Sequence, residues 1–241
     1  MGITKPHDIY DREAVAYAGV EARADFIVKT YIHLIAAIGL FAILCAVWYH
    51  TPATRMLAVK LLSYGSFAWL GFLGAFMVVS LIAHKMAEAE VSVGAQYFGL
   101  ALYVTAESFL FLPLLVIAGV MFPGSIEKGA SIAAVIFAGL TAFVFVTRKN
   151  FSFLRGVLCV GALAALGAIV AGAMFQFELG IVFTAIMLAL AAGFILYDTS
   201  NILYVYPPGR HVAASLALFS SVALLLWYAI RLAMYLQSSD D

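Results

Sequence analysis

The stretch from Gly156 to Tyr204 reads GVLCVGALAALGAIVAGAMFQFELGIVFTAIMLALAAGFILYDTSNILY. It holds 49 residues and only two formal charges, those of Glu178 and Asp198. A helix of about 20 residues crosses the roughly 30 Å hydrocarbon core of a bilayer. A run of 49 residues is therefore too long for one spanning helix. We expect two spanning helices joined by a tight turn at Glu178.

The rest of the chain has the same character. Of its 241 residues, 65% are hydrophobic and 11% are charged, whereas soluble domains carry about 25% charged residues. This composition excludes a soluble globular protein and makes membrane lipid the expected surroundings. Thirteen basic residues balance thirteen acidic ones, so no excess of charge points to nucleic acid as a partner.

Charged residues and turn signals divide the chain into seven candidate spans. We therefore predict an all-α integral membrane protein with a seven-helix bundle, in which residues 1–30 form an N-terminal segment and residues 31–241 the transmembrane domain. The expected spans are Tyr31–Tyr49, Leu61–His84, Val93–Phe122, Ala130–Thr147, Gly156–Phe177, Leu179–Tyr204 and Val212–Leu236.

Basic residues are distributed unevenly around these spans. Nine lie on the side of the N-terminus and four on the other side, so the positive-inside rule places the N-terminus in the cytoplasm and the C-terminus outside. We expect Arg231, near the outer end of the last span, to extend to the interface rather than pair in the core. For Arg12–Lys29 two alternatives stand: an amphipathic helix at the cytoplasmic surface, or a solvated tail.

Signatures of known enzymes are absent from the chain. It contains no P-loop, no G-x-S-x-G and no H-E-x-x-H pattern, and its five histidines are scattered. Cys45 and Cys159 fall in separate apolar runs and, with seven spans, lie in opposite leaflets, so we expect neither a disulfide nor a zinc site. We therefore predict a protein that is not an enzyme and has no cofactor, apart from Ca²⁺ as a candidate ligand.

Asp198 is the first candidate for a functional role. It lies near the end of the sixth expected span and is followed by Thr199, Ser200 and Asn201. A carboxylate near a helix C-terminus opposes the macrodipole, and burial in the membrane disfavours its charged form. Such a group suits proton sensing, and intramembrane acids usually have a role. The alternative is a hydrogen-bonded acid that closes a polar helix end.

Glu107 is the second candidate and lies midway along the third expected span, six residues before Pro113. Because proline has no amide hydrogen, a carbonyl one turn earlier loses its helix partner. A carboxylate and a freed carbonyl on one helix can coordinate a cation or relay a proton. The alternative is a neutral Glu107 bonded to Thr105, Ser108 or a neighbouring helix. Asp198 and Glu107 are thus candidate Ca²⁺ ligands.

Two segments carry a resemblance to a known family. Residues 196–202 read LYDTSNI, and residues 147–154 read TRKNFSFL. Together they resemble the Bax inhibitor-1 (transmembrane BAX inhibitor motif) family, with a closer likeness to its bacterial YccA branch, over about Leu70 to the C-terminus. The resemblance implies a bundle in which six helices surround a central one, in the bacterial inner membrane.

The resemblance also implies a function. Bacterial members of the family are pH-sensitive calcium leak channels, in which two aspartates of the last two helices share a proton and interact with a basic residue of the second helix. Asp198 matches the first aspartate, but Ser221, preceded by Ser220, takes the place of the second. Ser221 can hydrogen-bond Asp198 but cannot supply the second charge of a coupled pair. The candidate basic partners are Lys85 and His84.

The YccA branch implies a second function. It is associated with modulation of the membrane protease FtsH, which such proteins restrain through a cytoplasmic tail, here Met1–Lys29. Our leading hypothesis is a proton-responsive cation leak, plausibly for Ca²⁺, with Asp198, Ser221 and Glu107 as the sensing residues. The alternative is a modulator of FtsH, or a non-catalytic subunit of a larger membrane complex.

Overall fold

The computed structural model describes residues 14–88 and 92–238. Within these residues the chain forms one short 3₁₀ helix and eight α-helices, with no strands. They are η1 (Val15–Tyr17), α2 (Val20–His50), α3 (Pro52–Ser63), α4 (Ser66–Ala87), α5 (Val93–Met121), α6 (Ser125–Thr147), α7 (Leu154–Phe175), α8 (Ile181–Tyr204) and α9 (His211–Ser238).

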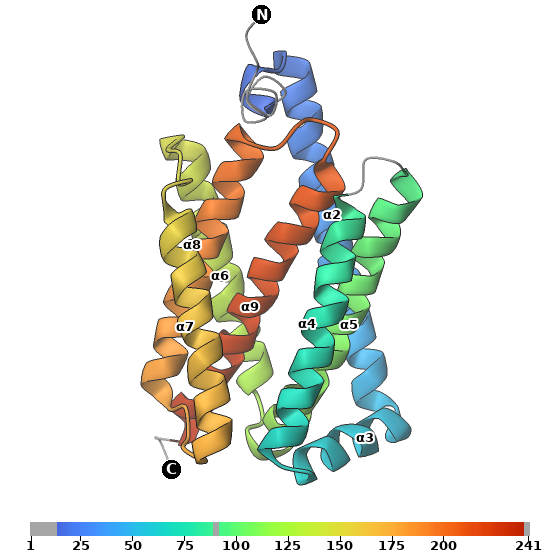
Figure 1. The fold of residues 1–241 in the computed structure, drawn as a ribbon, viewed down its shortest axis with the longest axis vertical. Coiled ribbons are helices and arrows are strands. Elements are labelled where there is room, and N and C mark those ends of the chain that lie inside the picture. The colour runs from blue at the N-terminus through green and yellow to red at the C-terminus, as the bar shows by residue number, and fades with distance from the viewer. Residues whose placement is uncertain (1–13, 89–91, 239–241) are drawn as a thin grey trace, which may run out of the picture.

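Seven of the described helices, α2 and α4 to α9, are long and apolar enough to cross a membrane. The prediction of seven spans is confirmed. These helices run along the long axis of the molecule, so α2 begins at one end and α9 finishes at the other (Figure 1). We call the end with η1 and the α8–α9 connection the N-terminal end, and the end with α3 the C-terminal end.

The first two spans differ from the predicted bounds. α2 begins at Val20, eleven residues before the expected start, so Val20–Lys29 is neither a separate surface helix nor a tail but continues the first spanning helix. An ion pair of 2.7 Å between Lys29 and Asp25 supports this segment. The second span begins at Ser66 rather than Leu61 because Gly65, with φ of 80°, separates it from α3.

The predicted turn at Glu178 is confirmed. α7 ends at Phe175, and α8 begins at Ile181. Gln176 caps α7 in the left-handed conformation, with φ of 57°. This turn returns the chain across the bundle, so that α8 runs antiparallel to α7 (Figure 1).

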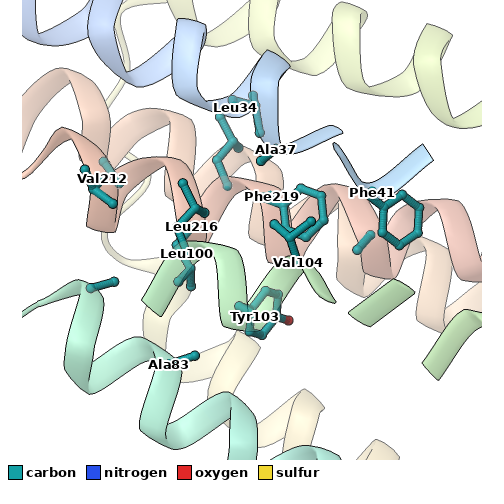
Figure 2. Close-up of a cluster of buried hydrophobic side chains, with 14 of the residues drawn as sticks. Leu34, Ala37, Phe41, Ala83, Leu100, Tyr103, Val104, Val212, Leu216 and Phe219 are labelled. Atoms are coloured by element: carbon teal, nitrogen blue, oxygen red, sulfur yellow. The ribbon is translucent and has the colours of Figure 1, made fainter. Parts of the chain in front are cut away.

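Two helices form the interior of the bundle. In the most apolar part of α5 and of α9, 67% of the residues are buried, against at most 28% in the other spans. α9 packs against α2, α4, α5, α6 and α8, which gives it the central place that the resemblance implied. Figure 2 shows side chains of α2 and α5 meeting α9, with the rings of Phe41 and Phe219 centred 5.7 Å apart.

Candidate functional site

A cavity of about 890 Å³ lies within the bundle. Its walls come from α3, α4, α5, α7, α8 and α9 and from the α7–α8 connection. Polar side chains line it between the middle of the bundle and the N-terminal end. We call these residues the polar end of the cavity: His84, Tyr103, Glu107, Asp198, Ser220 and Ser221.

Asp198 and Ser221 are in direct contact at the polar end. The Ser221 Oγ of α9 donates a hydrogen bond of 2.5 Å to Asp198 Oδ2 of α8. Both side chains are buried, with 7% of Asp198 exposed. The hydrogen bond that a serine at this position allows is thus present. It gives the carboxyl group a neutral donor where the family's pattern has a second acid.

Glu107 reaches the same network from α5. Its carboxyl group interacts with Tyr103, one turn earlier on that helix. The Tyr103 hydroxyl is hydrogen-bonded to Ser220 Oγ at 2.7 Å. Glu107 Oε2 is buried and has no hydrogen-bond partner among the described residues. Glu107 therefore retains an unused acceptor next to the cavity.

The two adjacent serines of α9 explain how the acids are brought together. Successive residues of an α-helix point about 100° apart. Ser220 therefore faces α5 while Ser221 faces α8. The central helix thus connects Asp198 to Glu107 through Ser221, Ser220 and Tyr103.

The sequence analysis did not identify Tyr103 or propose a role for Ser220. Tyr103 lies four residues before Glu107 and therefore on the same face of the helix. This spacing could have indicated that the two side chains interact. The partners considered for Glu107 on its own helix were wrong, because their hydroxyls bond elsewhere. Ser108 donates to the Thr105 carbonyl at 2.7 Å, and Thr105 donates to the Ala101 carbonyl at 2.8 Å.

The two candidate basic partners lie in different places. His84 lines the cavity, with its ring edge-on to Tyr103 at 5.2 Å and its Nδ1 hydrogen-bonded to the Ser80 carbonyl at 2.8 Å. Lys85 is exposed and does not line it. Among the residues that the structure describes, the one ion pair is Lys29–Asp25. Neither basic residue is therefore ion-paired with Asp198.

The donor set limits what kind of metal the cavity fits. In the described ranges, no three His, Cys, Asp or Glu side chains gather into a group that could hold a metal ion. Ca²⁺ takes about six to eight oxygen ligands. Two carboxyl groups and three hydroxyls suit a weakly held or passing cation better than a resident calcium ion.

The segments that carry the family resemblance meet at the N-terminal end. Ser200 Oγ accepts a hydrogen bond of 2.8 Å from the Phe151 backbone N–H and donates one of 3.4 Å to Asn150 Oδ1. The Tyr204 hydroxyl donates to the Arg148 carbonyl at 2.5 Å. The loop before α7 therefore fixes the last turns of α8, which carry Asp198.

The first described residues pack over the α8–α9 connection. Val15 is fully buried, and its backbone N–H donates to the Tyr206 carbonyl at 2.9 Å. The Arg23 guanidinium lies 5.9 Å from the centre of the Tyr204 ring. Burial raises the pKa of the Tyr206 phenol well above its usual range, so this loop residue stays neutral. The segment from Val15 to Arg23 is thereby held against the end of α8.

Arg231 lines the opposite, C-terminal end of the cavity. Its Nη2 donates to the Leu179 carbonyl at 3.0 Å and to the Tyr235 hydroxyl at 3.3 Å. The guanidinium is thus held against the α7–α8 connection and faces the cavity, instead of only extending to the interface. It forms no ion pair with any carboxylate that the structure describes.

The chain is similar to known membrane proteins. Residues 23–241 match the family described as Inhibitor of apoptosis-promoting Bax1. The chain is 38% identical over 82 residues to Uncharacterized protein PA2604 of Pseudomonas aeruginosa, covering 34% of each chain. It is 36% identical over 72 residues to Modulator of FtsH protease YccA of Escherichia coli K12, covering 30% of this chain and 33% of that protein.

Inner membrane protein YccA of Escherichia coli O6:H1 matches to the same extent, 36% over 72 residues. The matched parts span about a third of the length of these relatives. The family match, in contrast, extends from α2 to the C-terminus and includes both acids and both serines of the polar end. The chain therefore belongs to the Bax inhibitor-1 family, and its likeness to YccA over about a third of each chain supports the YccA-like branch of that family.

Proposed function

We propose that this multi-pass membrane protein is a proton-responsive cation leak, with Ca²⁺ as the cation to test first, and that Asp198 controls it. One observation carries the proposal. Asp198 and Glu107, 7% and 6% exposed, line the same cavity, and neither forms an ion pair with a described residue.

Neither Asp198 nor Glu107 has an oppositely charged partner among the described residues. A carboxylate removed from water is costly unless it is paired, hydrogen-bonded or neutralised by a proton. Ser221 supplies a neutral donor to Asp198, but no Lys or Arg among the described residues pairs with either acid. A proton bound to each acid, or a cation in the cavity, would neutralise its charge. Competition between the two at Asp198 would make cation passage depend on pH.

The orientation of the protein belongs to the same proposal. The unequal distribution of basic residues supports an N-terminus in the cytoplasm. The name of the relative from Escherichia coli O6:H1, Inner membrane protein YccA, supports the bacterial inner membrane as the location. In this orientation the polar end of the cavity faces the cytoplasm.

Calcium flux into dye-loaded proteoliposomes, measured between about pH 5 and pH 8, tests the proposal. We expect flux that changes with pH for the native protein and flux without that response for Asp198→Asn. Asp25→Asn is the matched control, because Asp25 is exposed on α2 and away from the cavity. A pH response that survives in Asp198→Asn, or an absence of flux at every pH, would overturn the proposal.

A second function is favoured by the comparisons: modulation of an FtsH protease. The relative from Escherichia coli K12 is named for this activity, and the N-terminal segment of this chain is rich in charge. The structure sharpens the test, because Val15 and Arg23 pack against the α8–α9 connection. Removing residues 2–13 alone keeps both Val15 and Arg23 in the chain.

Co-purification of the host FtsH with the full chain and with the shortened chain distinguishes the two functions. Modulation predicts that the shortened chain loses FtsH while its flux is unchanged. Equal recovery of FtsH by both chains would count against the tail as the point of contact. Both proposed functions are non-enzymatic.

A further inference from the structure

We propose that the C-terminal half of the cavity binds a single-chain anionic amphiphile, such as a fatty acid, with its head group at Arg231. This inference concerns a ligand site separate from the acids and does not depend on ion passage. It rests on the wall of the cavity, on its opening and on the cation at that opening.

The wall beyond the polar end is apolar. Ten residues of α9 separate Ser221 from Arg231, which corresponds to about 15 Å at the rise of an α-helix. Leu224 and Trp227 line the cavity along this stretch of α9, Leu166 and Ile169 line it from α7, and Leu73 lines it from α4. These side chains can hold a hydrocarbon chain but offer nothing to an ion.

The lining residues that are exposed, Leu62, Gly65 and Phe177, all lie at the C-terminal end, and we therefore infer that the cavity opens there. Leu62 of α3, 40% exposed, and Phe177 of the α7–α8 connection, 49% exposed, both line it. Helix α3 lies across this end of the bundle (Figure 1) and exposes Met56 and Val59. A short helix with exposed apolar side chains suits the membrane interface. An amphiphile in the bilayer can therefore enter the cavity at the level of its own head group.

Arg231 provides the charge that selects the head group. The two hydrogen bonds that hold the guanidinium, to Leu179 and Tyr235, both use Nη2. The other N–H groups of the fork form no hydrogen bond with a described residue, so they can bind a carboxylate, which guanidinium groups bind in a bidentate manner. Because no described carboxylate pairs with Arg231, the arginine favours an anionic head over a neutral or cationic one.

The size of the cavity favours one hydrocarbon chain. Its volume of about 890 Å³ lies within the range of roughly 300 to 1,000 Å³ that is typical of small-molecule sites. The polar end occupies part of that volume, and the apolar wall has the length of a medium chain. A fatty acid such as dodecanoate fits these limits, whereas a two-chain phospholipid does not.

The test uses the full chain in nanodiscs of zwitterionic lipid and a photoreactive analogue of dodecanoate. Cross-linked peptides are mapped by mass spectrometry, with competition by dodecanoate, dodecanol or dodecyltrimethylammonium. We expect labelling of cavity residues such as Ile169 and Leu73, and strong competition by dodecanoate only. Arg231→Gln should weaken the competition at least about ten-fold. Arg55→Gln is the matched control. The Arg55 guanidinium lies over the Tyr49 ring, as that of Arg231 lies over the Tyr228 and Tyr235 rings, but Arg55 does not line the cavity.

A second variant tests the proposal independently, in case Arg231→Gln does not fold. Ile169→Trp leaves the arginine in place and fills the apolar half, so it should abolish labelling within the cavity. Equal competition by the anionic and cationic amphiphiles would overturn the proposal. So would labelling restricted to outward residues such as Val160, which is 67% exposed, because that pattern shows only partition into the bilayer.

Discussion

The two ends of the cavity share the central helix α9 but differ in chemistry. At the polar end, α9 presents Ser220 and Ser221 to a tyrosine and an acid on neighbouring helices. About 15 Å further along the same helix, Arg231 stands at the end of an apolar wall. The acids and the arginine line one cavity without forming an ion pair among the described residues. Charges kept apart in this way each lack an oppositely charged partner among the described residues.

The largest expected effect comes from placing a side chain at Gly99 of α5, where this helix is in close contact with α4. A Cβ at Gly99 would lie 2.6 Å from the Ala83 carbonyl oxygen and 2.8 Å from the Ala87 backbone nitrogen. Gly99→Leu should therefore push α4 from α5 and lower stability by about 3 kcal/mol, seen as a lower thermal unfolding temperature in detergent. Gly94→Leu on the same helix is the control, because it meets only the Ser92 side chain, at 3.5 Å. Similar losses in both variants would contradict the close contact.

Removing the donor to Asp198 comes next. Ser221→Ala leaves a buried carboxyl oxygen without its hydrogen bond, which should cost about 1 to 3 kcal/mol. Chemical unfolding in micelles measures the loss. Ser131→Ala, which removes an exposed hydroxyl that donates to the Glu127 carbonyl, should change stability by less than about 0.5 kcal/mol. An unchanged stability of Ser221→Ala would mean that the bond contributes nothing to the fold.

Tyr103→Phe should have a smaller effect. It removes the hydrogen bond to Ser220 but keeps the ring that packs in the core, so we expect a loss of about 1 kcal/mol. The variant also separates Glu107 from the serines of α9 and should alter the pH dependence of flux. Tyr97→Phe removes the bond of an exposed tyrosine on the same helix to His33, and it should leave flux as it is. Identical flux profiles for the two variants would mean that Tyr103 does not influence the pH dependence of flux.

Thr199→Val should have the smallest effect. Thr199 follows Asp198 but does not line the cavity, and its buried Oγ1 has only a weak interaction with the Tyr31 hydroxyl of α2, without a hydrogen bond of good geometry among the described residues. Valine of the same shape should therefore change stability by less than about 1 kcal/mol in either direction. Unfolding and flux assays check both points. A large loss of either would show that the polar region extends beyond the cavity.

The spans and the turn at Glu178 could be predicted because lipid exposure forces long apolar runs between charges. The start of α2 could not be predicted, because the mixed charges of Val20–Lys29 are typical of a segment at the membrane surface or in water. The helix continues there since Phe26 is buried against residues distant in the chain, such as Tyr206. The separate α3 was missed because its apolar residues extend the hydrophobic pattern into the second span.

The candidate site was predictable only in part. Asp198 and Ser221 were paired through the family resemblance, and the structure brings them together. The contact between Tyr103 and Ser220 depends on how α5 and α9 are rotated against each other, which no local pattern determines. The cavity and the inward position of Arg231 likewise result from the packing of several helices.

Infrared difference spectroscopy of the full protein tests the central claim most directly, because it detects the protonated carboxyl group itself. We expect a carboxyl band that titrates with pH and decreases when Ca²⁺ is added at constant pH; it should lose the Asp198 contribution in Asp198→Asn and be unchanged in Asp25→Asn. A carboxyl band that responds to neither pH nor Ca²⁺, or one that is unchanged in Asp198→Asn, would contradict the claim.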